Sequence, residues 1–228
     1  MCRMFAYVGE SLDELKSLFI ALQSSAREDN IAKKYGLNPV HGDGWGYVIY
    51  DGEHLYYYKS VKPIFEEDFP LGLDLKGEFY AIFHARQATD KSTVSARFSH
   101  PFMESNDTYI YFFAHNGSVN DGKLRKELNF NGITTDSELA AKYYAKTENM
   151  KYLESITLSA LNVLILRIRR SDGVAELLYE NYYVKDRPDY YDLYLWKGKK
   201  GRAVMSSTLK LYGFLDVEQV PKGQLLKL

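Results

Sequence analysis

The sequence contains little that would place the protein outside the cell or in a membrane. It has one cysteine in 228 residues, so it cannot form an internal disulfide, the usual support of small secreted domains. Residues 1–30 lack the basic start and apolar run that mark a signal peptide. The longest apolar stretches, such as residues 161–166, are much too short to span a bilayer. We therefore expect a cytoplasmic protein.

The chain also lacks an excess of charge of either sign. Its formal net charge is −1 at pH 7, so no bulk field attracts it to nucleic acid or to an anionic membrane, and we expect neither as a partner. The five histidines show no HExxH spacing and no paired cysteines accompany them, so we expect no metal site. Residues 41–46, HGDGWG, fit neither the dinucleotide fingerprint nor a phosphate loop. We therefore expect no cofactor.

Aromatic residues, in contrast, are abundant. The chain has 20 tyrosines and 12 phenylalanines, which favour strands and aromatic packing. Its apolar content of 46% and charged content of 26% are ordinary for a globular protein. No low-complexity linker or internal repeat divides the sequence. We expect a single domain over residues 1–228 with one sizeable core.

Apolar patterning predicts strands with a few helices, which indicates an α+β domain. Ser11 and Glu14 form a capping box before a helix, and Thr135 and Glu138 form a second. A third helix is predicted over residues 152–160. The strands over residues 78–89 and 108–119 are apolar on both faces, so both faces must be covered. Further strands are predicted at residues 4–9, 45–60 (a hairpin), 162–170, 174–179, 190–196 and 202–207.

Two of these strands end in polar groups that a core does not require. Residues 78–89 run into His84 and Arg86, which period-two alternation places on one face. Residues 108–119 contain His115, followed by Asn116 and Gly117, a side-chain amide next to a flexible backbone N–H. Asn-Gly is also a strong hairpin-turn signal, and taken alone the turn is the simpler explanation.

With these motifs taken together, the sequence resembles the class II glutamine amidotransferase domain, a branch of the N-terminal nucleophile hydrolases. Several short motifs in the family's order are stronger than any one alone. They occupy roughly the first three-fifths of the chain: MCRMFAYVG (1–9), HGDGWGY (41–47), FHARQAT (83–89), SHPF (99–102), FAHNGSV (113–119) and TTDSE (134–138). The resemblance implies a four-layer αββα sandwich and a stand-alone amidotransferase domain.

The resemblance gives the lone cysteine a role. If Met1 is removed, Cys2 carries both a thiol and a free α-amine, whose pKa of about 7.7–8.0 suits it to accept the thiol proton. One residue then supplies the nucleophile and its base. The family pattern implies that Cys2 attacks the side-chain amide of glutamine, while Asn116 and Gly117 form the oxyanion hole.

The same resemblance implies the residues that bind the substrate. Arg86 would bind the α-carboxylate of glutamine and Asp136 its α-ammonium, while Thr89 and His100 would shape the pocket and its closing loop, residues 90–100. A strand-end arginine and an acid in the first turn of a helix also have ordinary structural explanations. Arg86 is better explained by the intact motif, whereas Asp136 is the weaker assignment.

The expected function is hydrolysis of glutamine, or of a γ-glutamyl amide, through a thioester on Cys2, with release of ammonia. A separate synthase subunit would receive that ammonia unless the reaction is simple hydrolysis. Two alternatives stay open: an N-terminal cysteine amidase for another amide, and a catalytically silent regulatory subunit with this fold. The tyrosine-rich residues 181–194 are compatible with a homo-oligomer surface and equally with edge strands.

Overall fold

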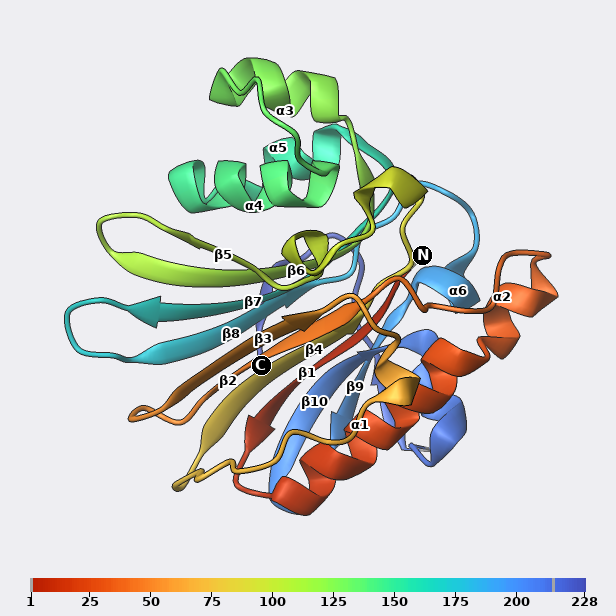
Figure 1. The fold of residues 1–228 in the computed structure, drawn as a ribbon, viewed down its shortest axis with the longest axis vertical. Helices are drawn as coiled ribbons and strands as arrows, with labels where there is room; N and C mark the ends of the chain where they lie inside the picture. Colours follow the sequence, from red (N-terminus) through yellow and green to blue (C-terminus); the bar gives the residue numbers. More distant parts are fainter. Residues whose placement is uncertain (1, 215) are drawn as a thin grey trace.

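The computed structural model describes residues 2–214 and 216–228. Two antiparallel sheets lie face to face (Figure 1). The first has the strand order β11-β9-β10-β1-β4-β2-β3 and the second the order β12-β8-β7-β6-β5. β1 is therefore the central strand of the larger sheet, with β4 on one side and β10 on the other.

The strands of the larger sheet are β1 (Arg3–Gly9), β2 (Trp45–Tyr50), β3 (Leu55–Ser60), β4 (Phe79–Ala85), β9 (Leu193–Lys197), β10 (Gly201–Ser206) and β11 (Val217–Gln219). Those of the smaller sheet are β5 (Phe102–Ser105), β6 (Tyr109–Val119), β7 (Thr157–Arg169), β8 (Ala175–Glu180) and β12 (Leu226–Lys227). The α-helices are α1 (Leu12–Arg27), α2 (Asn30–Lys34), α3 (Asp121–Leu128), α4 (Asp136–Thr147), α5 (Met150–Ser155) and α6 (Pro188–Tyr191). The 3₁₀ turns are η1 (Ile64–Glu66), η2 (Lys91–Thr93), η3 (Ala96–Phe98) and η4 (Ser207–Tyr212).

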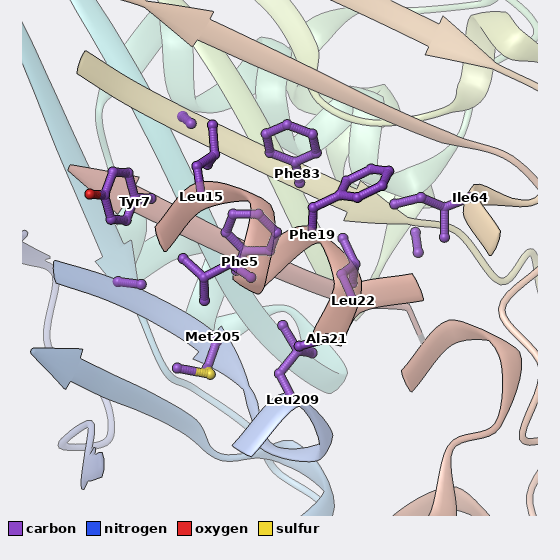
Figure 2. Close-up of a cluster of buried hydrophobic side chains, with 14 of the residues drawn as sticks. Phe5, Tyr7, Leu15, Phe19, Ala21, Leu22, Ile64, Phe83, Met205 and Leu209 are labelled. Carbon is purple, nitrogen blue, oxygen red and sulfur yellow. The ribbon is translucent and has the colours of Figure 1, made fainter. Parts of the chain in front are cut away.

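The molecule has the four layers that the family resemblance implies. Helix α1 covers the outer face of the larger sheet, α4 and α5 cover the outer face of the smaller one, and α3 packs on α4 (Figure 1). Three buried apolar clusters fill the spaces between successive layers. Figure 2 shows the cluster between α1 and the larger sheet, where Leu15, Phe19 and Leu22 of the helix meet side chains of the strands. The α+β sandwich is therefore confirmed.

Strand alternation explains why both sheets are covered on both faces. In β4, Phe79, Ala81 and Phe83 pack toward α1, whereas Ile82 packs between the two sheets. In β6, Phe112 also packs between the sheets. The opposite face of β6, with Tyr111 and Phe113, packs against the helices of the smaller sheet. A strand with apolar side chains on both faces thus separates two cores.

The predicted helix ends are formed by the expected side chains. Ser11 accepts a hydrogen bond from the N–H of Glu14 at 3.2 Å, and Thr135 accepts one from the N–H of Glu138 at 3.2 Å. Each bond satisfies an N–H that the helix itself leaves without a partner.

Three predicted elements are wrong in their bounds. The strand predicted over residues 78–89 ends at Ala85. The helix predicted over residues 152–160 ends at Ser155, and β7 begins at Thr157, which pairs with Val119 of β6. Pairing along the full length of β6 outweighs the local helical spacing. The strand predicted over residues 190–196 begins only at Leu193, because Pro188 starts the short helix α6 and buries Tyr190 and Tyr191. These two tyrosines therefore pack within the chain.

The topology brings three strand ends together. Arg3 pairs with Ala85, so Cys2 lies beside Arg86. A hydrogen bond from His84 Nε2 to the His115 carbonyl oxygen, 3.3 Å long, links β4 to the end of β6 in the other sheet. None of the helices in the described part of the chain is long and apolar enough to cross a bilayer.

Candidate active site

A cavity of about 220 Å³ opens beside Cys2. This volume is below the range of about 300–1,000 Å³ typical of drug-sized ligands, so the cavity suits a small molecule such as an amino acid. Six of the seven residues predicted to form the site lie in its wall: Cys2, Arg86, Thr89, His100, Gly117 and Asp136. The seventh, Asn116, directly precedes Gly117 in β6.

Cys2 is 8% exposed and lies at the start of the central strand. Its Sγ accepts a hydrogen bond from the N–H of Gln87 at 3.3 Å. Burial raises the pKa of the Cys2 thiol, and the nearby guanidinium groups of Arg86 and Arg3 oppose this rise. At neutral pH the resting thiol therefore keeps its proton and needs a base. The predicted removal of Met1 concerns a residue outside the described part of the chain.

Asn116 and Gly117 differ in their surroundings: the side chain of Asn116 is buried without a partner in the part of the chain that the structure describes, whereas Gly117 is packed closely against the backbone of β7. The side chain of Asn116 is 1% exposed, and neither atom of its amide has a hydrogen-bond partner among the described residues. Gly117 has a φ of +145°, and a Cβ there would lie 1.9 Å from the carbonyl oxygen of Ala160. Only glycine fits this position. The pairing of β6 with β7 changes register between Gly117 and Val119.

Arg86 is 5% exposed and its guanidinium lies against the 3₁₀ turn η2. It donates to the carbonyl oxygen of Thr93 at 2.9 Å and to the Thr93 hydroxyl at 2.7 Å. Burial lowers the pKa of Arg86, whereas Cys2, Asp43 and Asp136 favour its charged form. Arg86 therefore places a positive charge at the cavity and holds part of the predicted closing loop.

Asp136 is the first residue of α4, where a carboxylate suits the helix dipole. It accepts hydrogen bonds from the N–H of Val119 at 3.0 Å and from its neighbour Ser137 at 2.9 Å. The carboxylate thus connects α4 to the end of β6. Because Asp136 also lines the cavity, its carboxylate places a negative charge in the wall that also contains Arg86.

Two histidines complete the wall between the sheets. His100 is buried and its ring stacks on His84 with centroids 4.0 Å apart. His115 donates from Nε2 to the Ala160 carbonyl oxygen, 3.2 Å away, so its Nδ1 accepts from the Ser137 hydroxyl, 2.9 Å away. Burial lowers the pKa of both His100 and His115, which keeps them neutral at pH 7. They shape the pocket without adding charge.

Thr89 is exposed and lies at the mouth of the cavity, one residue after Ala88. Asp43, from the glycine-rich segment 41–46, fixes this loop: its Oδ2 accepts from the N–H of Ala88 at 2.8 Å and from the ammonium group of Lys91 at 2.5 Å. The loop from residue 87 to residue 93 is therefore held from both sides.

A buried charge network behind Cys2 was not predicted from the sequence. Asp29 lies between the guanidinium of Arg3 and the ring of His41, and all three side chains are fully buried. Asp29 also accepts from the hydroxyl of Thr208 at 2.8 Å. Arg3 donates to the carbonyl oxygen of Cys2 at 3.3 Å. A charged residue directly after Cys2, inside an otherwise apolar strand, was the available signal.

No group of three or more His, Cys, Asp or Glu side chains suited to a metal ion occurs within residues 2–214 and 216–228.

Comparisons with known proteins identify the family and the fold. A family model described as glutamine amidotransferases class-II matches residues 1–147. The putative glutamine amidotransferase YafJ of Escherichia coli (strain K12) is 28% identical over 118 residues, which cover 48% of this chain and 44% of that protein.

Among solved structures, glutamine phosphoribosylpyrophosphate amidotransferase from B. subtilis matches with a TM-score of 0.68 at 20% identity, covering 99% of this chain and 47% of that one. A structure described as the allosteric regulatory enzyme of purine biosynthesis matches with a TM-score of 0.65, also at 20% identity, covering 98% of this chain and 46% of that one. These two likenesses concern the fold. The chain spans about half the length of the proteins it matches.

Proposed function

Because this chain belongs to the class II glutamine amidotransferases, we propose that it hydrolyses the side-chain amide of glutamine, or of a γ-glutamyl amide, at Cys2. The observation that carries the proposal is the cavity beside Cys2, whose wall combines a thiol with the opposite charges of Arg86 and Asp136. A free amino acid presents a carboxylate and an ammonium group to its binding site. Within this one small cavity, Arg86 can pair with the carboxylate of the amino acid and Asp136 with its ammonium group.

The proposed reaction begins at the sulfur. Once Met1 is removed, the α-amine of Cys2 takes the thiol proton, and the sulfur forms a bond to the amide carbon. The amide nitrogen takes up that proton as its bond to carbon breaks, and ammonia or an amine leaves. Water then adds to the thioester carbon, the carbon–sulfur bond breaks, and glutamate is released with the thiol restored.

Asn116 and Gly117 are proposed to stabilise the oxygen of the tetrahedral intermediate. The Asn116 amide is buried and has no hydrogen-bond partner among the described residues, although such groups are normally paired. An amide donor kept free in this way is ready for a charge that exists only during the reaction. The backbone N–H of Gly117 is the second proposed donor.

Arg86 is proposed to hold the α-carboxylate through two parallel hydrogen bonds and Asp136 to hold the α-ammonium. Thr89 and His100 are proposed to line the pocket. Residues 1–228 are proposed to act as one catalytic domain. Amidotransferase domains of this family typically pass ammonia to a synthase, and we propose a separate synthase subunit as a partner of this chain.

The test measures glutamate release from glutamine by matured protein and by a Cys2→Ala variant. We expect release by the first and none by the second, because the variant has no nucleophile. A glutamine analogue with an electrophilic diazoketone should add one adduct, mapped to Cys2. Full turnover by Cys2→Ala would contradict the proposal.

The substrate assignment is tested with an Arg86→Lys variant. Lysine cannot make the bidentate contact, so we expect KM for glutamine to rise by about tenfold or more, while a neutral amide without an α-carboxylate is affected much less. Arg170→Lys, at an exposed arginine that follows β7 at the end remote from Gly117, is the matched control. Equal losses for both amides would favour an amidase for another substrate.

A further inference from the structure

A second cavity adjoins the one at Cys2. It has a volume of about 470 Å³ and shares three wall residues, Gln87, Ala88 and Thr89, with the first. Neighbouring residues of β6 line different cavities: Gly117 lines the first cavity and Ser118 lines the second. The two cavities therefore adjoin at the loop that contacts the Cys2 sulfur.

The position of the second cavity relates it to the scissile bond. In the proposed pose, Arg86 and Asp136 hold the amino-acid end of the substrate in the first cavity, and the side-chain amide reaches Cys2. The nitrogen of that amide then points away from the amino-acid end. The second cavity contains neither Arg86 nor Asp136 in its wall, and it begins beyond Gln87, whose N–H contacts the Cys2 sulfur. It thus lies on the side of the leaving nitrogen.

Free glutamine does not need this space, because its leaving group is ammonia. A cavity of about 470 Å³ is instead large enough for a substituent on the amide nitrogen. Apolar surface is supplied by Leu37 and by the buried rings of Tyr190 and Tyr191. Hydroxyl groups are supplied by Ser118 and Ser159, whose oxygens are 2.7 Å apart.

The charge of the wall selects the kind of substituent. Lys91, Lys185 and Arg187 line the cavity, and no Asp or Glu does. Lys91 is neutralised by Asp43. Lys185 and Arg187 have no ion pair within residues 2–214 and 216–228.

The acidic residue nearest in sequence on α6, Asp189, is already engaged. It pairs with the ammonium group of Lys34 at 2.6 Å and also accepts from the hydroxyl of Tyr35. Asp186, between Lys185 and Arg187 in sequence, is exposed and does not line the cavity, so the side chains of the wall itself carry more positive than negative charge.

Resting on the function proposed above, we infer that the preferred substrate is a γ-glutamyl amide whose amine portion carries an anionic group, bound in the second cavity by Lys185 and Arg187. Hydrolysis breaks the bond between the γ-carbonyl carbon and the substituted nitrogen. The products are glutamate and a free amine that keeps its anionic group. The enzyme would then consume the product of a reaction that joins glutamate to such an amine through its side-chain carboxyl.

The test compares γ-glutamylglycine with γ-glutamylglycinamide, which are similar in size and differ by the charge of the leaving amine. We expect kcat/KM of the unmodified enzyme to be about tenfold higher for the charged compound, since two solvent-accessible charge contacts contribute. In a Lys185→Gln/Arg187→Gln double variant this ratio should fall to about one. An unchanged ratio in the double variant, or equal rates with the unmodified enzyme, would overturn the inference.

A matched control removes two positive charges at the far end of the sheet. Lys199→Gln/Lys200→Gln changes exposed lysines before Gly201, which pairs with Gly9, at the opposite end of β1 from Cys2. This double variant should keep the ratio of the unmodified enzyme. A loss in the control equal to that in the Lys185/Arg187 variant would mean that only net charge matters, and would also overturn the inference.

A binding measurement separates this inference from the proposed function. In a Cys2→Ala background, calorimetry should show tighter binding of γ-glutamylglycine than of γ-glutamylglycinamide. That preference should be absent when Lys185 and Arg187 are also replaced by glutamine. Hydrolysis without this preference retains the proposed function and rejects the inference. Preference without hydrolysis retains the site and rejects the proposed function.

Discussion

At the scale of single residues, the site combines a buried thiol with a buried amide that has no partner. Burial raises the pKa of Cys2, so the sulfur rests as a neutral thiol beside its backbone donor, Gln87. The Asn116 amide is buried without a hydrogen bond among the described residues. In a structural role, such an amide would lower stability, because the water it loses is not replaced. The geometry suits a group whose partner is the reacting oxygen.

An Asn116→Ala variant should therefore lose activity without losing stability. Removing one oxyanion-hole donor typically lowers kcat by about 10²–10³, while KM should change little because the donor acts on the intermediate. The melting temperature should stay the same or rise, since no hydrogen bond is broken on the protein side. Steady-state kinetics and thermal melts measure the two effects. A large fall in melting temperature with kcat unchanged would assign Asn116 a structural role.

Several residues of the candidate site could be predicted and others could not. Cys2, Arg86, Gly117 and Asp136 stand in short motifs whose order is itself a signal, and the fold places them at one cavity. Asp29 stands in no motif, and it meets Arg3 only because α1 returns the chain across the sheet. Contacts between distant segments depend on tertiary packing, which local patterns do not encode.

At the scale of elements, α1 is fixed to the sheet by its first turn. Ser11 caps the helix through Glu14 and also donates its N–H to the Tyr7 hydroxyl at 3.2 Å. Tyr7 in turn donates to the carboxylate of Glu14 at 2.9 Å. The start of the helix is therefore tied to β1, the strand that carries Cys2.

A Ser11→Ala variant should lower the free energy of unfolding by about 1 kcal/mol, the usual contribution of such a cap. Glutamine hydrolysis at 25 °C should be unchanged, because Ser11 lies beyond the far end of β1 from Cys2. Urea denaturation measures the change. Ser17→Ala, within the same helix on its exposed side, is the control and should be neutral or slightly stabilising, since alanine has the higher helix propensity. Equal effects of the two substitutions would contradict the capping role.

Elements with a strong internal pattern were predictable, and those decided by their neighbours were not. β6 and α1 carry apolar residues at the period of their structure, and both are found at the expected positions. Residues 157–160 were predicted to continue a helix, and β7 forms there instead because β6 supplies a pairing edge down to Val119. β9 begins only at Leu193, because Tyr190 and Tyr191 belong to the short helix α6 and are buried there.

At the scale of the whole molecule, four neutral histidines are buried around the site: His41, His84, His100 and His115. Burial is the main cause that lowers the pKa of each of them, to about 4 for His41 and about 3 for His84. Their ordinary pKa is 6.5 in the unfolded chain. At a pH between the lowered pKa values of the folded protein and 6.5, these histidines bind protons in the unfolded chain but not in the folded one.

Stability should therefore be fully present above pH 6.5 and should fall as the pH drops from about 6.5 toward 4, because protonation favours the unfolded chain throughout that window. The denaturation midpoint in urea, measured at pH 7, 6 and 5, should decrease stepwise. A midpoint that stays constant from pH 7 to pH 5 would contradict this account.

The central place of β1 in its sheet has a consequence for how the protein is made. Residues 3–9 are synthesised about 200 residues before β10, one of their two pairing neighbours. While the chain is being made, Cys2 therefore precedes a strand that is still unpaired along one side. The cavity beside Cys2 should form in its final shape only after β10 has been added.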